Sequence, residues 1–286
     1  MLNHIQRFPN AATVLILVAL FITVSARAAD IASTTAPTQT PRERALAFVA
    51  AGNQRAAEHL IEGLLQDTAK NHVRPHVEDV FFAAVCRRSR FEIQQAAPLF
   101  KYVNEANSFT THGQAAGLIL EIDSQKNVDA DFATLDELWS HNQTDPLLLW
   151  MVAVQCRSLK KPDIGVNRYE MLCQLWNPGP VLVHQTYANL LDELHRSGEA
   201  LVHRQMAVKI EPQYWSYDGL GNTLTALGRW VEADAAYAES TRLAPNQAWL
   251  WNNWAISKQA RGDTAGMAEL MVKVRELEKA VAARGN

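Results

Sequence analysis

The sequence predicts an all-α protein built as an array of repeated helix pairs. Its 286 residues are 48% apolar and 20% charged, which is ample for a folded core and excludes global disorder. Glycine and proline are few, at 13 and 11, and alternating β-branched runs are rare, so an all-β sandwich with many tight turns is disfavoured. A period of about 34 residues in the apolar pattern then predicts a repeat architecture.

The first residues have the layout of a secretory signal peptide. Arg7 precedes an apolar run at residues 11–24, which is shorter than the roughly 18–20 residues that cross a bilayer as a helix. Ala26 and Ala28 have the small side chains and spacing of a signal-peptidase site. We therefore expect residues 1–28 to be a cleaved signal peptide. The mature chain would then be periplasmic or secreted, without a membrane span.

Two further expectations concern this N-terminal part of the chain. The alternative to cleavage is a membrane anchor formed by the uncleaved N-terminal segment. Residues 29–41 have no apolar periodicity, and we expect them to form a flexible linker.

Charge and cysteine content narrow the class of protein. The formal net charge of -3 leaves no general basic excess, so nucleic acid is not an expected partner. Three cysteines are too few for a disulfide framework. Cys156 and Cys173 are expected on antiparallel helices but about two turns out of register, roughly 10 Å, so a bridge between them is disfavoured. Cys86 lies among apolar residues and is expected to be a buried small hydrophobe.

The repeat is clearest near the C-terminus, where small and large side chains alternate in a fixed order. The pattern consists of Tyr217-x2-Leu220-Gly221-x2-Leu224, a turn at Gly228, Trp230, Ala233-x3-Tyr237, Leu243 and Pro245. It resembles the tetratricopeptide repeat almost position for position. Two antiparallel helices can cross closely where a small residue of one faces a small residue of the other, and large residues fill the adjacent space.

The same pattern recurs in the neighbouring repeats. About 34 residues later, Trp251, Trp254 and Ala255 are followed by a turn at Gly262. In the preceding repeat, His184, Tyr187 and Ala188 occupy the corresponding positions. There, His195 replaces the usual turn glycine and Arg204 replaces the usual aromatic residue of the second helix.

Upstream the match weakens but the period persists. The first helices of about seven pairs are expected to begin near Arg42, Pro75, Thr111, Asp145, Pro180, Tyr214 and Ala248. Residues 42–178 are expected to form divergent helical repeats. Residues 179–286 are expected to form tetratricopeptide repeats that end in a capping helix at residues 264–284 with a charged outer face. Pro98 is expected to interrupt the second helix of its pair unless that helix begins at Ala97.

The resemblance implies a right-handed superhelix whose concave face binds a peptide or a partner protein. Helical spacing places the following residues on that face of the first helices: Gln185, Asn189, Asp192, Trp215, Asp218, Asn222, Trp249, Asn252 and Ile256. Asn189 and Asn222 could pair with an extended peptide backbone, and Trp215 and Trp249 could be apolar anchors. The alternative is that these asparagines and tryptophans serve only local packing.

The charge of this face predicts the kind of segment that it binds. Some tetratricopeptide-repeat proteins grip a C-terminal carboxylate with lysine and arginine, but the predicted face has none. A neutral or basic extended segment is therefore the expected ligand.

Other groups of polar residues do not predict a metal site or a catalytic site. His72 and His76 are separated by Arg74-Pro75, which breaks the helix that a shared metal would need. Asp192 and His195 have no visible nucleophile or oxyanion donors beside them. Arg87, Arg88 and Arg90 are expected to offset the negative end of a helix dipole. We therefore expect no catalytic site, no metal and no cofactor.

Taken together, the sequence predicts an exported protein–protein interaction scaffold, with envelope assembly or secretion as its setting by analogy. The alternative is a structural solenoid that associates with itself through an end repeat. An enzyme is disfavoured because no convergent catalytic set is visible.

Overall fold

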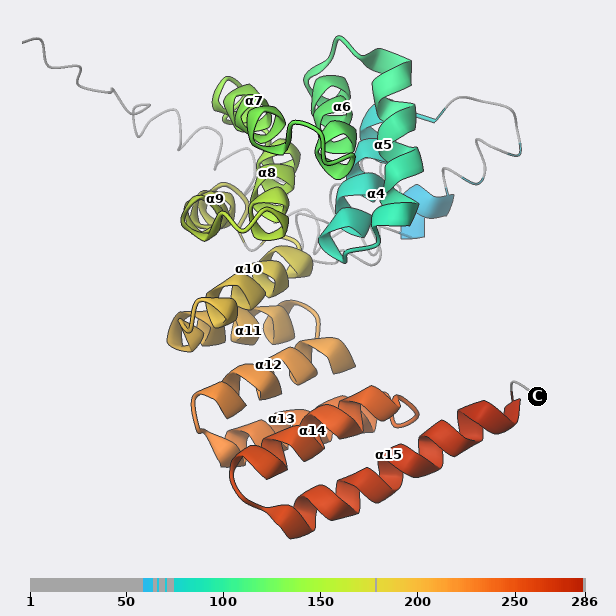
Figure 1. Ribbon diagram of the computed structural model, residues 1–286, viewed down its shortest axis with the longest axis vertical. Helices are drawn as coiled ribbons and strands as arrows, with labels where there is room; N and C mark the ends of the chain where they lie inside the picture. Colours follow the sequence, from blue (N-terminus) through green and yellow to red (C-terminus); the bar gives the residue numbers. More distant parts are fainter. Residues whose placement is uncertain (1–58, 64–65, 67–69, 71–74, 178, 285–286) are drawn as a thin grey trace, which may run out of the picture.

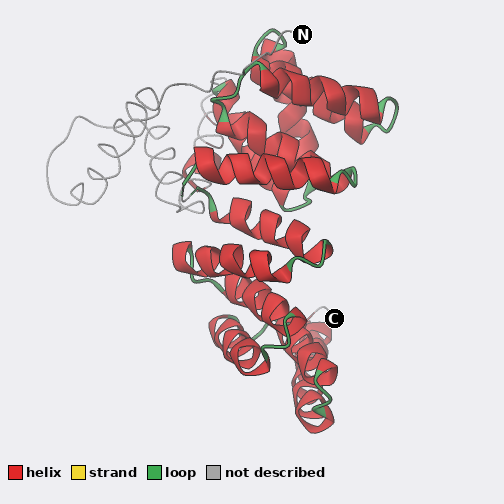
Figure 2. Cartoon of the chain, turned by 90° about the vertical axis from the view of Figure 1, so that its left-hand side faces the viewer, coloured by secondary structure: helices red, strands yellow, loops and turns green. Residues whose placement is uncertain are grey.

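The computed structural model describes residues 59–63, 66, 70, 75–177 and 179–284, and all regular structure in these ranges is helical (Figures 1 and 2). The helices with assigned bounds are α4 (Val77–Ser89), α5 (Ile93–Asn107), α6 (Thr111–Asp123), α7 (Val128–Ser140), α8 (Pro146–Ser158), α9 (Pro162–Leu175), α10 (Val181–Glu193), α11 (Ser197–Ile210), α12 (Tyr214–Ala226), α13 (Trp230–Leu243), α14 (Ala248–Ala260) and α15 (Thr264–Arg284). No helix in these ranges has the length and apolar character that crossing a bilayer requires. The predicted signal peptide, the linker and the start of the first pair near Arg42 lie outside the described residues.

The helices pack as successive antiparallel pairs that form a solenoid, as predicted (Figure 1). The first helices begin at or within two residues of the predicted positions, and the capping helix α15 has the predicted bounds. Local capping explains two of these starts. The Thr110 side chain accepts a hydrogen bond from the Gly113 N–H, and Asp145 accepts from the N–H groups of Leu147 and Leu148. These bonds satisfy amides that the first turn of a helix leaves without a helical partner.

The turn inside each pair uses one residue in the left-handed region. The residues are Phe91, Gln125, Lys160, His195, Gly228 and Gly262, with φ between 54° and 82°. The prediction that His195 takes the place of a turn glycine is thus confirmed. Only the last two of these turns have a glycine, which adopts this conformation without a steric penalty.

Close packing of small against large residues holds α12 and α13 together. A Cβ atom on Gly221 of α12 would lie 2.8–2.9 Å from ring atoms of Tyr237 on α13. Tyr237 and Ala233 are fully buried beside this contact. The predicted small-to-large alternation is therefore the packing interface between the two helices.

The prediction for Pro98 is wrong, because α5 begins at Ile93 and contains the proline. The Glu92 carbonyl accepts bonds from the N–H groups of Gln95 and Ala96, which start the helix. Pro98 cannot donate to the carbonyl of Gln94, but both residues are exposed. Water can therefore bond to that carbonyl and the helix continues.

The N-terminal and C-terminal pairs differ in what their concave face contains. When the pairs are aligned on the left-handed turn residue, the positions of Gln185 and Asn189 on α10 correspond to apolar residues in α4, α6 and α8. These residues are Phe81, Val85, Ala115, Ile119, Trp150 and Val154, and all are buried. Because α4 packs against α8 and α10, the earlier pairs close this face on themselves. The corresponding residues of α10, α12 and α14 are Gln185, Asn189, Asp218, Asn222, Asn252 and Ile256, so among the described pairs this face is mostly polar only from α10 onward.

Arg88 joins the helices of this closed part. Its Nη2 donates to Asp123 Oδ1 at 3.0 Å, at the end of α6, and to Gln155 Oε1 at 3.2 Å on α8. Burial lowers the pKa of Arg88 and raises the pKa of Asp123, and the charge of each partner opposes both shifts. Arg87, Arg88 and Arg90 do lie at the end of α4. The prediction that all three offset the negative end of the helix dipole is incomplete for Arg88. Arg88 is buried between helices, where it pairs with the half-buried carboxylate of Asp123.

Candidate functional site

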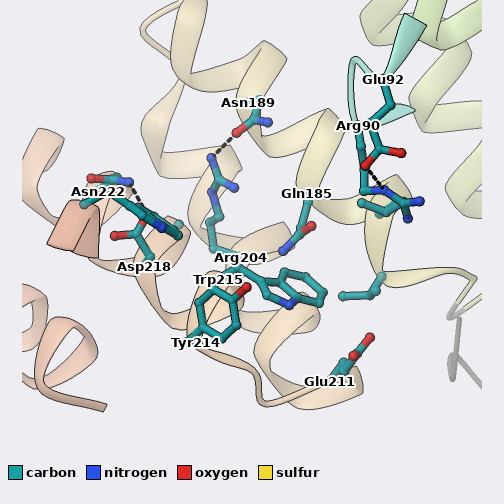
Figure 3. A pocket seen from close by; sticks show the side chains of 14 residues that line it. Arg90, Glu92, Gln185, Asn189, Arg204, Glu211, Tyr214, Trp215, Asp218 and Asn222 are labelled. Atoms are coloured by element: carbon teal, nitrogen blue, oxygen red, sulfur yellow. Dashed lines mark hydrogen bonds and ion pairs between the residues drawn. The ribbon is translucent and has the colours of Figure 1, made fainter. Parts of the chain in front are cut away.

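A pocket of about 600 Å³ lies on the open part of the concave face (Figure 3). Side chains of α10, α12 and α14 form most of its lining. Arg204 of α11, Glu211 and the α4–α5 turn complete it. The pocket brings together these residues of the predicted face: Gln185, Asn189, Trp215, Asp218, Asn222 and Trp249. Asn252 is half-buried and is not part of the lining.

Two asparagines one repeat apart are held in the same way by the second helix of their own pair. Asn189 Oδ1 accepts a bond from Arg204 Nη2 at 2.6 Å, and Asn222 Oδ1 accepts one from the Tyr237 hydroxyl at 2.8 Å. Arg204 and Tyr237 occupy the same position of their repeats. The second helices therefore fix the orientation of both amide groups, and each carboxamide keeps further donor and acceptor capacity.

Asp218 lies one turn before Asn222 on α12 and also lines the pocket. Its carboxylate accepts bonds from Asn222 Nδ2 at 3.1 Å and from Asn253 Nδ2 at 3.0 Å. Burial raises the pKa of Asp218 to about 6, although these hydrogen bonds and Arg204 act in the opposite direction. The carboxylate is therefore mostly ionised at neutral pH and becomes protonated in mild acid.

The prediction that this face contains no lysine or arginine is wrong. Arg204 and Arg90 both line the pocket. Helical spacing places only first-helix residues on this face and therefore does not predict Arg204, whose guanidinium reaches the face from the second helix α11. A Cβ on Gly219 would lie 2.8 Å from its Nη1, so the absence of a side chain at Gly219 makes room for it.

Acidic groups nevertheless outnumber these two cations. Arg204 Nη2 lies 3.1 Å from Asp192 Oδ2, and Arg90 Nε lies 3.0 Å from Glu92 Oε1. Glu211 and Asp218 also line the pocket, so the lining has three acidic residues, with Glu92, against the two arginines, and Asp192 lies beside it. The pocket is therefore acidic on balance.

Aromatic side chains, together with Val181 and Leu182, form the apolar part of the pocket. Trp215 is half-buried, whereas Trp249 is 44% exposed and meets the ring of Tyr214 edge to face at 6.2 Å. The neighbouring Trp254 serves packing, because its Nε1 donates to Asp234 Oδ1 at 2.7 Å and its ring stacks on Tyr237. Exposure thus separates Trp249, which a ligand can reach, from the tryptophan that packs between helices.

The remaining polar candidates are placed as follows. His76 is exposed and lies 3.6 Å from Glu78, while His72 lies outside the described residues. Asp192 is paired with Arg204 and accepts from the Thr223 hydroxyl at 2.7 Å, whereas His195 is exposed. The described cysteines Cys86, Cys156 and Cys173 are all free, and Cys86 is buried as predicted. Within the described ranges, one cluster of side chains could hold a metal ion: Cys173, His184 and His203.

Comparison with solved structures places this architecture among tetratricopeptide-repeat folds. MamA from Desulfovibrio magneticus RS-1 matches 64% of this chain and 96% of its own, with a TM-score of 0.51 and 17% identity. YrrB, described as a TPR protein with an unusual peptide-binding site, matches 65% of this chain and 98% of its own, with a TM-score of 0.50 and 15% identity. No family model and no curated protein matches the sequence. The chain therefore has the tetratricopeptide-repeat fold.

Proposed function

We propose that this protein is an interaction scaffold that holds an extended segment of a partner protein in the pocket between α10, α12 and α14. The observation that carries the proposal is the contrast along the concave face. The earlier pairs fill this face with their own apolar side chains, whereas the later pairs leave it polar and hollow. A pocket that repeats the same polar position from helix to helix suits a ligand that also repeats, such as an extended backbone.

The lining suits a neutral or basic segment. Asn189 and Asn222 are oriented by Arg204 and Tyr237, so binding a backbone amide costs little side-chain ordering. Trp249 offers an exposed apolar surface for a side chain of the ligand. The excess of carboxylates repels an acidic segment and attracts a basic one. YrrB, which has the same fold, is described as peptide-binding, and this description supports the proposal.

The proposed setting is outside the cytoplasm, in envelope assembly or secretion. The signal-like residues 1–28 support export. The proposal includes no catalytic role. Cell fractionation with N-terminal sequencing tests the setting: export predicts a mature chain that begins near residue 29 in the periplasm or medium. A full-length protein retained in the cytoplasm would contradict it.

Peptide binding to the purified protein tests the pocket. A display library of extended peptides is selected on the wild type, and the selected peptides are measured against a Trp215→Ala, Asn222→Ala, Trp249→Ala triple variant. We expect neutral or basic peptides to be selected and the triple variant to lose at least roughly 100-fold in affinity, since buried aromatic anchors each contribute about 2 kcal/mol or more.

The control carries Trp230→Ala and Asn246→Ala, which remove the same side-chain types outside the pocket lining. Equal binding by the triple variant and this control would contradict the proposal. Selection of acidic peptides would contradict the charge argument while leaving the pocket in place.

Self-association is the alternative function. The terminal helix α15 exposes Val272 and Val281, at 50% and 66%, although charged residues surround them. Light scattering that finds a monomer at every concentration would remove this alternative.

A further inference from the structure

Three metal-ligating side chains from three consecutive helices meet outside the pocket. Cys173 lies on α9, His184 on α10 and His203 on α11 (Figure 1). One ligand atom of each lies within 4.8 Å of the other two. His184 is buried, and the other two side chains are half-buried. The cluster therefore spans the junction between the pair α8/α9 and the pair α10/α11.

The spacing of the ligand atoms is close to that of a tetrahedral metal site. With Zn–N about 2.0–2.1 Å and Zn–S about 2.3 Å, two nitrogens lie about 3.3 Å apart and a nitrogen and a sulfur about 3.6 Å apart. Nδ1 of His184 and Nδ1 of His203 are 3.0 Å apart, so both imidazoles present a nitrogen to one point. A rotation of the Cys173 side chain supplies the remaining adjustment of about 1 Å.

The surroundings favour neutral imidazoles, which are the form that binds metals. Burial and the charge of His184 lower the pKa of His203 to about 4. The His203 ring also lies against the Tyr187 ring, with 4.4 Å between centroids. Burial and the nearby Glu170 raise the pKa of Cys173 to about 12, so the thiol is protonated in the free protein and a cation has to displace this proton when it binds.

None of the three cluster residues is part of the pocket lining. At 100° per residue, His184 lies about 60–160° around α10 from the four pocket residues of that helix, Val181, Leu182, Gln185 and Asn189. His203, however, directly precedes Arg204, which orients Asn189 in the pocket. An ion held here would fix α11 against α9 and α10 without occupying the pocket.

We propose that Cys173, His184 and His203 form a binding site for Zn²⁺. One thiolate and two imidazoles are a ligand set that Zn²⁺ prefers over the oxygen ligands of Mg²⁺ or Ca²⁺. The fourth position is left to water, and the site clamps the junction between the two helix pairs. This proposal is independent of peptide binding.

The test uses the full chain, purified without a histidine tag, with Co²⁺ and Zn²⁺ as probes. We expect Co²⁺ to give a thiolate-to-cobalt charge-transfer band, and Zn²⁺ to abolish that band at one equivalent per chain. Because loss of a group that merely orients a ligand already weakens metal affinity by roughly 10–100-fold, Cys173→Ser and His203→Gln should each weaken it by at least roughly 100-fold. Cys156→Ser and His195→Gln are the matched controls outside the cluster.

Two results would overturn the metal site. One is the absence of a cobalt charge-transfer band, and the other is equal metal binding by the ligand variants and the controls. Either result would mean that His184 and His203 are only a hydrogen-bonded pair. If the ligand variants lose helical content, the wild type alone decides the question. Zn²⁺ should then slow maleimide modification of Cys173 at least tenfold, and an unchanged rate would refute the site.

Discussion

Removal of the Arg204 guanidinium should strongly destabilise the helices around the pocket. Arg204 Nη2 binds Asn189 Oδ1 and Asp192 Oδ2, and its Nε donates to Thr223 Oγ1 at 3.2 Å. One side chain of α11 thus connects α10 to α12. In Arg204→Ala, Asp192 keeps only the bond from the Thr223 hydroxyl among these contacts.

The expected loss follows from the burial of the pair. Arg204 is buried, and the Asp192 side chain is 22% exposed. Removing one partner of a buried ion pair costs about 3–5 kcal/mol, because the other charge is left without compensation. The partial exposure of Asp192 and its bond to Thr223 place the expected loss at the lower end, about 3 kcal/mol.

Urea unfolding and amide hydrogen exchange measure this loss together, because arrays of repeats open locally as well as globally. We expect the lost protection to be concentrated in α10–α12. Arg196→Ala is the control: it removes an arginine whose pair with Glu199 is at the surface, and it should cost less than about 1 kcal/mol. If Arg204→Ala and Arg196→Ala differ by less than about 0.5 kcal/mol, the assignment of Arg204 as a connecting residue is wrong.

Three further predictions test other parts of the structure. Gly221→Ala should destabilise the protein by about 1–3 kcal/mol in urea unfolding, because the added methyl group would overlap the Tyr237 ring. Gly198→Ala is the control: a methyl group there would meet nothing within 4 Å, so this change should be neutral or stabilising. Equal effects of the two changes would refute the packing argument. Gln125→Gly should raise the free energy of unfolding by about 1 kcal/mol, because Gln125 has a φ of 62°, and Gln125→Ala should not. The pKa of Asp218 is raised from 3.8 to about 6 in the folded protein, so folding favours the protonated carboxyl. The resulting contribution to the free energy of unfolding is present in full below pH 4 and is lost as the pH rises through 6. This contribution is about 3 kcal/mol, at 1.36 kcal/mol per pKa unit. Asp218→Asn should remove this part of the pH dependence between pH 4 and 7, and an unchanged slope would show that another group titrates there.

The period of the sequence was enough to predict the helix starts, because every pair repeats the same packing and turn geometry. Thr111, Tyr214 and Ala248 were placed correctly as first helical residues. His195 was predicted to replace a turn glycine, and its φ of 58° agrees. These features depend on residues close together in the chain.

Contacts between distant helices could not be predicted in this way. The packing of α4 across α8 and α10 depends on how the solenoid curves. The runs of apolar residues in α4 and α8 do indicate that these two helices are buried on most sides. In the sequence Arg204 is an exception to the repeat pattern, but its reach into the pocket depends on the space at Gly219. The sequence does not predict the cluster of Cys173, His184 and His203, because its members lie on three helices and share no short motif.

Site-specific photo-crosslinking tests the central claim most directly. The crosslinker is placed at Asn222 or Trp249 in the pocket, or at Trp230 outside its lining, and the captured chain is mapped by mass spectrometry. The proposed function predicts that both pocket positions capture the same neutral or basic segment of one other protein and that Trp230 does not. Capture from Trp230 alone, or capture only of a second copy of this chain from every position, would contradict it.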